Sequence, residues 1–313
     1  MIKKKVGIVG AGVYGQALNK LLSLNENNEV LISDVISKDL PNFVSMDEVL
    51  KCEYLVFAIP SKFVYDFLVK HKDKFSKEQK ILIGTKGFAS DGTLLSSNFA
   101  NYFLRENICY LAGPGFASEI MENPEITRLN ISGFKIKVAE EFSTLFCDKV
   151  CSYTNDILSF EITSALKNVA AFICGISYGK FESLNLKYAV ASKMYCEIGA
   201  VVEFFGGNVL TCLTNPLLQA DLYMTASQKK SRNFKFGAIV ANGESFKKCV
   251  SELDFTVESL ETINALEKMK VLNSNIFKDL VIFPKICDLA SGKINLDEFI
   301  LVLRNLNFSC CEL

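Results

Sequence analysis

A lysine inside an apolar segment is the first residue whose position suggests chemistry. Lys167 lies beside Asn168 in ALKNVAAFICGI, residues 165–176, which is apolar on nearly every side of a helical wheel. A helix of this kind is normally buried, and lysine is almost never fully buried without a partner. Burial disfavours the charged amine and lowers its pKa, so such a lysine can act as a general acid or base. The alternative is a lysine whose amine extends to solvent at the helix edge.

A glycine pattern near the N-terminus suggests a nucleotide site. GAGVYG, with Gly10, Gly12 and Gly15, follows an apolar segment and precedes a helical one. In dinucleotide-binding folds these glycines form the turn, admit the pyrophosphate and let the helix pack on the strand, while the helix start binds the phosphates. Asp34 lies 19 residues after Gly15, where an acidic residue binds the ribose hydroxyls. Its carboxylate would repel the 2′-phosphate of NADP and favours NAD, although Ser33 could face the ribose instead.

Polar or glycine-rich groups follow three other apolar segments. Ligands of a parallel α/β sheet bind beyond the carboxyl ends of its strands. Lys86 could place an ammonium group near an anionic ligand there, although a lysine at a strand end is usually only solvated. Gly113 and Gly115 would let backbone amides approach a ligand, or would form an ordinary turn. The three segments are AIPS (58–61), GTKGF (84–88) and AGPGFA (112–117).

A basic segment lies much later in the chain. KKSRNFKFG, residues 229–237, contains Arg232 between Ser231 and Asn233. The planar fork of arginine binds phosphate through paired hydrogen bonds, and neighbouring hydroxyl and amide groups can complete the shell. The segment therefore predicts a phosphate site, unless it is only a solvated charged face.

The elements that position these residues follow from the hydrophobic pattern. Continuously apolar segments alternate with helical ones in the first half, which predicts a parallel sheet covered on both faces. From about residue 156 to 305 the apolar spacing is helical. The chain is therefore expected to be α/β, with an N-terminal Rossmann-like mostly parallel sheet (1–155) and a C-terminal all-α domain (156–313). Expected strands are 5–10, 29–34, 54–60, 80–87 and 108–114, continued through RLNISG and VCSYT, and expected helices are 15–25, 45–51, 62–75 and 91–106.

Composition narrows the class of protein. The formal net charge of −1 gives no reason to expect nucleic acid or an anionic membrane as the main partner. No apolar run is expected to approach the roughly 18 residues that span a bilayer. The 11 cysteines form no CxxC pairs, which argues against zinc or a disulfide framework and favours a reducing cytoplasm. The single histidine, His71, lies in a lysine-rich segment and is expected at a loop or helix end, so a histidine base is not expected.

Taken in order, these motifs resemble those of NAD(P)-dependent glycerol-3-phosphate dehydrogenase, with the bacterial soluble form as the nearest type. The set is GAGVYG, FAIPS, TKG, AGPGFA, ALKNVAA, and DLYMT followed by SRNFKFG, over roughly residues 4 to 300. The resemblance implies that dihydroxyacetone phosphate and sn-glycerol 3-phosphate are interconverted with NAD(P)H in the cytoplasm, which supplies the backbone of phospholipids. It also implies an active site between the two domains, and we expect a homodimer.

The resemblance assigns roles to individual residues. Lys167 corresponds to the catalytic lysine, and Lys86 and Asp221 complete the catalytic group. Predicted substrate contacts are Lys86, Gly113, Gly115, Asn168, Thr225, Ser231, Arg232 and Asn233. Predicted cofactor contacts are Gly10, Gly12, Val13, Tyr14, Gly15, Asp34, Pro60, Lys86, Ala117, Arg232 and Glu258. No metal site is expected.

The chain departs from the family pattern at several loop positions. Leu218, Gln219 and Ala220 replace the glycines before the aspartate, Gly115 stands where threonine is common, and Ser259 stands where glycine is usual. The charged residues are kept, so the changes bear on loop geometry. Two rival hypotheses remain open: a related dehydrogenase of the β-hydroxyacid or ketopantoate type, and a non-catalytic NAD(H)-binding redox sensor.

Overall fold

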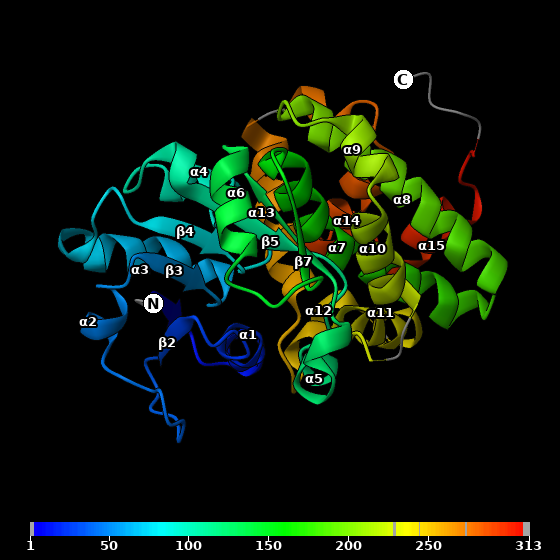
Figure 1. Ribbon diagram of the computed structural model, residues 1–313. Coiled ribbons are helices and arrows are strands. Elements are labelled where there is room, and N and C mark those ends of the chain that lie inside the picture. The colour runs from blue at the N-terminus through cyan, green and yellow to red at the C-terminus, as the bar shows by residue number, and fades with distance from the viewer. Residues whose placement is uncertain (1–2, 228–229, 244, 273, 309–313) are drawn as a thin grey trace.

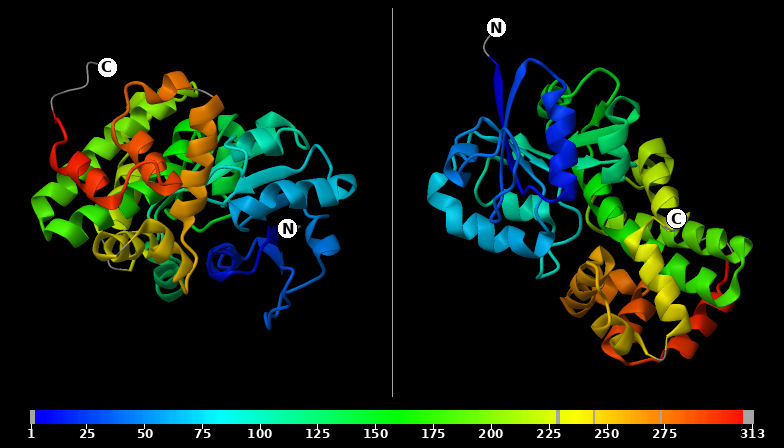
Figure 2. Two further views of the ribbon diagram at one scale, coloured as in Figure 1. Left: turned by 180° about the vertical axis from the view of Figure 1, so that it is seen from behind. Right: turned by 90° about the horizontal axis from the view of Figure 1, so that it is seen from below.

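The protein consists of a sheet-containing half followed by a helical half (Figure 1). The computed structural model describes residues 3–227, 230–243, 245–272 and 274–308. The view from below in Figure 2 separates the two halves, with the blue and cyan N-terminal elements on one side and the yellow to red helices on the other. This is the predicted α/β architecture with a helical C-terminal part.

The sheet has seven strands in the order β2-β1-β3-β4-β5-β6-β7. All neighbours pair in parallel except β5 and β6, which are antiparallel. The mostly parallel sheet was predicted, and the continuously buried strands explain why, because both of their faces are covered. The strands are β1 (Lys4–Val9), β2 (Asn28–Ser33), β3 (Tyr54–Phe57), β4 (Lys80–Ile83), β5 (Ile108–Ala112), β6 (Leu129–Gly133) and β7 (Cys151–Thr154).

Helices cover both faces of the sheet. The helices α1 (Val13–Ser23) and α6 (Ile136–Ser143) pack on one face, and α2 (Met46–Val49), α3 (Val64–His71) and α4 (Leu95–Phe99) pack on the other. A capping box begins α2, since the side chains of Ser45 and Glu48 satisfy each other's backbone amides. The short helix α5 (Ala117–Glu122) was not predicted.

Two of the predicted helices are wrong in extent. The predicted helix 91–106 is only α4 plus turns, since Gly92 adopts a positive φ of 88° and a separate 3-10 turn forms at Arg105–Asn107. The predicted helix 62–75 contains α3 between 3-10 turns at Ser61–Phe63 and Lys72–Lys74. His71 ends α3 as expected, but its ring lies 4.5 Å from that of Phe67 and is half-buried rather than solvated.

The helical half is built around one long helix, α7 (Ile157–Phe181), whose side chains are buried over most of its length. Asp156 caps it two residues after β7 ends, so the change from sheet to helix is abrupt. The proposed division of the chain at residue 155 rests on this change. The remaining helices are α8 (Leu184–Phe204), α9 (Val209–Thr214), α10 (Pro216–Ser227), α11 (Arg232–Asn242), α12 (Phe246–Ser251), α13 (Glu258–Leu272), α14 (Ile282–Ser291) and α15 (Leu296–Arg304).

Two glycines allow α7 and α11 to touch backbone to backbone. A Cβ atom at Gly175 would lie 2.2 Å from the carbonyl oxygen of Phe234, and one at Gly237 would lie 2.0 Å from that of Phe172. Larger residues would force the helices apart. This close crossing fixes α11, which begins with Arg232, relative to α7, which carries Lys167.

The helix α7 is long and apolar enough to span a bilayer by length and composition, contrary to the expectation from the sequence that no segment approaches this length. However, 94% of its most apolar window is buried inside the protein. Its apolar surface is therefore covered by the surrounding helices, as in the central helix of a helical domain.

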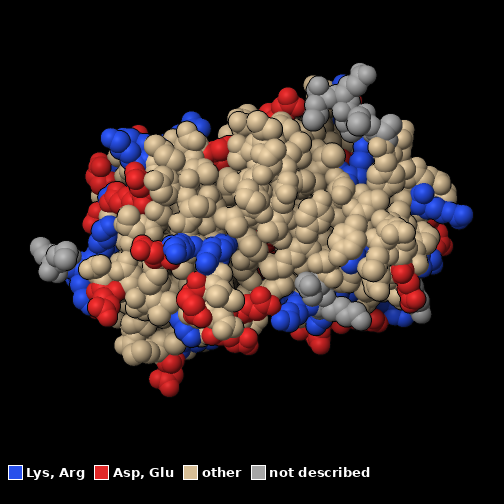
Figure 3. All heavy atoms as spheres, turned by 45° about the vertical axis from the view of Figure 1, so that its right-hand side comes forward, with Lys and Arg blue, Asp and Glu red and all other residues tan. Residues whose placement is uncertain are grey.

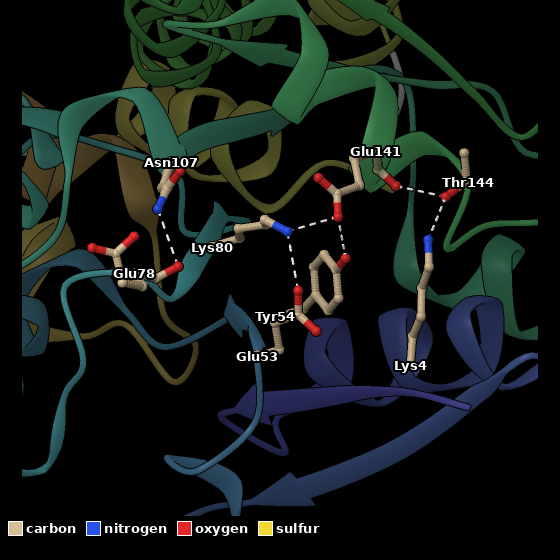
Figure 4. Close-up of polar contacts among 8 residues, drawn as sticks. All are labelled: Lys4, Glu53, Tyr54, Glu78, Lys80, Asn107, Glu141 and Thr144. Atoms are coloured by element: carbon tan, nitrogen blue, oxygen red, sulfur yellow. Dashed lines mark hydrogen bonds and ion pairs between the residues drawn. The ribbon is translucent and has the colours of Figure 1, made fainter. Parts of the chain in front are cut away.

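A charged cluster occupies the opposite edge of the sheet from the glycine turn, at the amino ends of the strands (Figure 4). The amine of Lys80 lies 3.0 Å from a carboxylate oxygen of Glu53 and 2.7 Å from one of Glu141. The hydroxyl group of Tyr54 donates to the same oxygen of Glu141. Because these groups satisfy one another, the cluster holds α6 against the sheet edge and does not suggest a ligand site.

Candidate active site

The predicted acid lies at the centre of the molecule, where α7 meets α10. Lys167 is 3% exposed, so its amine does not extend to solvent. The amine donates to a carboxylate oxygen of Asp221 and lies 3.5 Å from the hydroxyl oxygen of Thr225. Asp221 and Thr225 lie one turn apart on α10 and face the same way, and the Thr225 hydroxyl donates to the Asp221 carbonyl at 2.6 Å. The structure thus brings three predicted site residues together.

The charge of Asp221 acts on two lysines, of which Lys167 contacts it. Burial lowers the pKa of Lys167 to about 8. The neighbouring charge of Lys86 adds to this lowering, and the carboxylate of Asp221 opposes it. The pKa of Lys86 is raised, because the attraction of the carboxylates of Asp221 and Glu258 outweighs the cost of burial. Lys86 therefore stays cationic at neutral pH, while Lys167 titrates just above it. The two pKa values therefore differ in the way that the two roles require, with Lys86 as a fixed charge and Lys167 as a proton donor.

The second carboxylate oxygen of Asp221 is buried and has no hydrogen-bond partner among the described residues. Buried polar atoms are normally paired, and an exception at a functional site calls for an explanation. A hydroxyl group of a bound ligand would satisfy this oxygen. The unpaired atom therefore marks a place for a substrate hydroxyl beside the amine of Lys167.

Lys86 follows β4 and lies where the sheet meets the helical half. Gly87 after it has a φ of 107°, and a Cβ atom there would lie 3.1 Å from the Ser61 hydroxyl oxygen and 3.7 Å from that of Thr262 on α13. The positive φ requires glycine at this turn, and the contact with Ser61 leaves little room for a side chain. The turn therefore directs the preceding lysine into the junction.

A second polar group joins three helices. Asn168 of α7 donates from its side-chain amide to Glu258 at 2.9 Å, and Arg232 of α11 pairs with the other carboxylate oxygen of Glu258 at 3.1 Å. Asn168 is buried, whereas Arg232 and Glu258 remain partly exposed. One carboxylate therefore holds two of the predicted substrate ligands in place, at the surface side of Lys167.

The two residues flanking Arg232 serve the backbone. The Ser231 hydroxyl accepts from the Phe234 amide at 3.3 Å and caps α11, while the Asn233 side-chain oxygen accepts from the Ser259 amide at 2.9 Å near the start of α13. Both are predicted phosphate ligands, and in both bonds the side chain is the acceptor, so the Ser231 hydroxyl and the Asn233 amide group keep their donor hydrogens. Lys229 of the same basic segment lies outside the described residues.

The glycine turn fits a dinucleotide. Gly10 adopts a φ of 106°, and a Cβ atom at Gly15 would lie 1.9 Å from the Gly10 carbonyl oxygen, so both positions require glycine. A Cβ atom at Gly12 would meet nothing within 4 Å, and no side chain caps the start of α1. Space beside an uncapped helix start is what a pyrophosphate needs. The residues present therefore fit NAD(P).

Asp34 lies at the carboxyl end of β2, next to the glycine turn. One of its carboxylate oxygens accepts from the Ala11 amide at 2.6 Å, and the other accepts from the Ile36 amide at 3.3 Å. Ser33 is buried, and its carbonyl accepts from the Gly10 amide at 2.8 Å. Of the two residues weighed from the sequence, Asp34 is the one that reaches the turn and can meet a ribose.

The remaining predicted contacts lie along the same edge of the sheet. Val13 is exposed at the start of α1, and Pro60 is exposed just after β3. Gly113 has a φ of 125°, and a Cβ atom there would lie 3.0 Å from the Cα atom of Leu129. Its glycine is thus explained by close packing against β6. Gly115 and Ala117 lead into α5 and are half-buried.

Sequence reasoning missed a buried carboxyl group at the junction. Glu161 on α7 is fully buried, and one of its oxygens accepts from the Ser96 amide at the start of α4 at 3.1 Å. Its other oxygen, the Ser96 hydroxyl and the hydroxyl of buried Tyr110 have no hydrogen-bond partner among the described residues. The only sign of this group in the sequence was a glutamate in the apolar segment before ALKNVAA. Through its bond to Ser96, Glu161 ties the helical half to the sheet half.

Glu161 makes stability depend on pH. Burial raises its pKa to about 7, so the folded protein favours the neutral form, and the stability that this preference contributes is lost as the pH rises from about 4.5 to about 7. Glu161→Gln lacks this titrating group. We therefore expect its unfolding free energy, relative to that of the wild type, to rise by about 3 kcal/mol across this pH window. Urea unfolding at pH 5 and pH 8 measures the difference.

The matched variant for this measurement is Glu197→Gln. Glu197 is also buried, but its oxygens accept from the amides of Val281, Ile282 and Phe283 at the start of α14. We expect that substitution to destabilise the fold at both pH values. Equal, pH-independent effects of the two substitutions would contradict the assignment of Glu161 as an unsatisfied buried acid.

Comparisons with known proteins cover most of the chain. The family model for the NAD-dependent glycerol-3-phosphate dehydrogenase N-terminus matches residues 23–135, and that for the C-terminus matches residues 156–301. The curated glycerol-3-phosphate dehydrogenase (NAD(P)+) of Campylobacter jejuni is 36% identical over 85% of this chain and 88% of its own length. That of Sulfurimonas denitrificans is 34% identical over 84% of this chain and 87% of its own length.

The fold is also similar to a solved structure. The crystal structure of glycerol-3-phosphate dehydrogenase from Coxiella burnetii superposes with a TM-score of 0.83 at 20% identity, covering 97% of this chain and 99% of the other. At this identity the likeness concerns the fold. It extends over both the sheet and the helical half.

Proposed function

The chain belongs to the NAD-dependent glycerol-3-phosphate dehydrogenase family, and on this premise we propose that it interconverts dihydroxyacetone phosphate and sn-glycerol 3-phosphate with NAD(P)H. The observation that carries the proposal is the buried Lys167–Asp221 pair, placed between a dinucleotide turn and Arg232. The test is oxidation of NADH started by dihydroxyacetone phosphate, and an inactive protein would refute the proposal.

Lys167 is the proposed general acid. Reduction at C2 of dihydroxyacetone phosphate turns the carbonyl oxygen into an alkoxide, which needs a proton as the charge develops. The amine of Lys167 supplies that proton, and Asp221 keeps the amine oriented through its hydrogen bond. In the reverse direction the neutral amine accepts the proton of the C2 hydroxyl group. The unpaired oxygen of Asp221 is placed to accept a second substrate hydroxyl.

The phosphate group is the proposed anchor of the substrate. Arg232 lies at the exposed end of the site, where it pairs with Glu258, and its guanidinium group can bind the phosphate through two parallel hydrogen bonds. Lys86 adds a fixed positive charge nearer to Asp221. Binding the remote phosphate supplies energy to position the carbonyl group at Lys167.

The glycine turn, the start of α1 and Asp34 are the proposed holders of the dinucleotide. The bound cofactor supplies or takes the hydride exchanged with C2. The turn lies at the carboxyl ends of the parallel strands, on the same side of the sheet as Lys86. This chain therefore provides the pyrophosphate contact from backbone amides and the ribose contact from a carboxylate.

The pKa of Lys167 sets the expected pH dependence. The acid form is required for ketone reduction, so kcat/KM for dihydroxyacetone phosphate should be constant below about pH 8 and fall tenfold per pH unit above it. Oxidation of glycerol 3-phosphate requires the neutral amine, so its kcat/KM should rise with pH and level off above about 8. Profiles of kcat/KM in both directions measure this. Two profiles that rise together would contradict a shared lysine acid and base.

Asp34 should determine cofactor preference. Removing its carboxylate in Asp34→Ala takes away both a ribose acceptor and the repulsion of a 2′-phosphate. We expect the ratio of kcat/KM for NADH to that for NADPH to fall about tenfold or more. Asp39→Ala, an exposed aspartate in the same loop, is the control and should leave the ratio unchanged. A wild-type preference for NADPH would refute this use of Asp34.

The wider setting is proposed from the family. The partner is a small phosphorylated molecule. Figure 3 shows positive and negative side chains interspersed over the visible face, whereas a nucleic-acid partner would favour a stripe of positive charge. Glycerol 3-phosphate made here would enter phospholipid synthesis. We propose a cytoplasmic homodimer, a state that size measurement in solution would test.

A further inference from the structure

The side chain of Tyr14 reaches from the dinucleotide turn toward the substrate side of the junction. Tyr14 is the second residue of α1 and follows Gly12 and Val13. Its ring lies beside Gly84 at the end of β4, where an added Cβ atom would be 3.6 Å from the Cε1 atom of Tyr14 and 3.1 Å from the Phe57 carbonyl oxygen. The ring therefore packs at van der Waals distance from the end of β4, the strand that leads to Lys86.

The ring of Tyr14 lies against the ammonium group of Lys86. The amine of Lys86 lies 5.4 Å from the ring centroid, within the range of a cation–π contact. Burial raises the pKa of the Tyr14 phenol, which Lys86 lowers and Asp221 and Glu258 raise further, so the side chain lies among the charges of the substrate site. The hydroxyl group stays protonated at neutral pH.

An aromatic contact of this kind suits Lys86 better than a second ion pair would. The charge of Lys86 repels the ammonium form of Lys167, and Asp221, which attracts both amines, is hydrogen-bonded to Lys167. A further carboxylate beside Lys86 would fix it but would neutralise its charge and occupy its N–H donors. An aromatic face attracts the cation and leaves the donors free for an anionic ligand.

We propose that Tyr14 is a positioning residue for the substrate: its ring face holds Lys86 in the junction, while its backbone belongs to the turn that receives the dinucleotide. The inference rests on the proposed function, because it takes dihydroxyacetone phosphate as the anion that Lys86 meets. It assigns the Tyr14 side chain to the substrate, whereas sequence analysis expected only a cofactor contact at this position.

The test compares three substitutions that differ in the ring. Tyr14→Phe and Tyr14→Trp keep an aromatic face, and Tyr14→Leu removes it while keeping an apolar side chain in the helix. We expect the KM for dihydroxyacetone phosphate to be about tenfold higher in the Leu variant than in the Phe variant, with the dissociation constants for NADH within about twofold of each other. Thermal melting of each variant confirms that it is folded.

A double-mutant cycle then asks whether the ring acts through the lysine. With Lys86→Met as the background, changing Tyr14 from Phe to Leu should raise KM by less than about twofold. Equal KM values for the Phe and Leu variants in the Lys86 background would overturn the proposal. A tenfold loss of NADH affinity without a change in KM would overturn it too, and would assign the ring to the cofactor.

A chemical measurement separates this inference from the proposed function. The rate at which acetic anhydride labels Lys86 is compared by mass spectrometry with that of the exposed Lys137 in the same protein. We expect the ratio of the two rates to be several-fold higher in Tyr14→Leu than in Tyr14→Phe, whether or not dihydroxyacetone phosphate is a substrate. An unchanged ratio would overturn the holding role even in an active enzyme, and a wild type inactive on this substrate would refute the proposed function alone.

Discussion

Substitution of Lys167 by alanine is expected to reduce kcat for dihydroxyacetone phosphate by about a thousandfold or more, while the dissociation constant for NADH stays within about twofold. A general acid placed in the transition state contributes typically about 10²–10⁴-fold, and the neighbouring Lys86 is a poor substitute because its raised pKa makes it hold its proton. Stopped-flow or initial-rate oxidation of NADH measures kcat, and quenching of protein fluorescence or NADH emission measures binding.

The alanine variant leaves the carboxylate of Asp221 buried without its cation, which can destabilise the fold. Lys167→Arg avoids this problem, because arginine keeps the ion pair but does not release its proton near neutrality. We expect this variant to melt near the wild-type temperature and still to lack turnover. Lys187→Met is the matched control, since Lys187 is another buried lysine but lies among the rings of Tyr178, Tyr188 and Phe234. A fully active Lys167→Arg variant would contradict the assignment of the acid.

Removal of the Arg232 guanidinium is expected to have the second largest effect, on substrate binding. In Arg232→Ala the KM for dihydroxyacetone phosphate should rise about a hundredfold, because charge-assisted paired hydrogen bonds to the phosphate are lost. Arg232→Lys should recover only part of the loss, since an ammonium group cannot make the paired contact. The fold should change little, because the Arg232–Glu258 pair is exposed.

Unphosphorylated dihydroxyacetone gives the control for this prediction. If Arg232 acts on the phosphate, kcat/KM for dihydroxyacetone should be nearly the same in the wild type and in Arg232→Ala. The preference of the enzyme for the phosphorylated ketone would then fall by the full hundredfold factor. A parallel loss on both ketones would show instead that Arg232 acts through Glu258 and the packing of α13.

The fold was predictable where a local pattern is strong. Continuously apolar strands indicated a sheet covered on both faces, and the family resemblance drawn from the motifs is confirmed by the family models and the curated relatives. The segment 91–106 was not predictable, because its apolar residues pack against the sheet from turns as well as from α4. The antiparallel pairing of β6 with β5 depends on long-range packing, which periodicity does not report.

The candidate site was predictable in its residue types and only partly in its geometry. Lys167 was indicated by a charge in an apolar helix, but its partner lies 54 residues away on α10, and only the resemblance pointed to Asp221. The capping roles of Ser231 and Asn233 depend on where α11 and α13 begin. Glu161 was missed because its partners belong to α4, an element that the sequence did not delimit.

The residues that depart from the family pattern lie in helices near the site. Leu218 and Ala220 lie on α10 just before Asp221, and Leu218 is buried in the core of the sheet half. Ser259 is buried near the start of α13, where its amide donates to Asn233. These residues are accommodated in helices, and the carboxylate of Asp221 still reaches Lys167. They give no structural reason to favour a non-catalytic sensor.

The most direct measurement of the central claim is the initial rate of NADH oxidation by the wild type and by Lys167→Arg, with dihydroxyacetone phosphate, dihydroxyacetone and ketopantoate in parallel, and with NADPH replacing NADH in a second series. We expect rapid turnover of dihydroxyacetone phosphate by the wild type, little with the other two ketones, and none by the variant. Turnover of ketopantoate alone would favour the related dehydrogenase, and NADH binding without turnover of any ketone would contradict the proposed enzyme and favour a redox sensor.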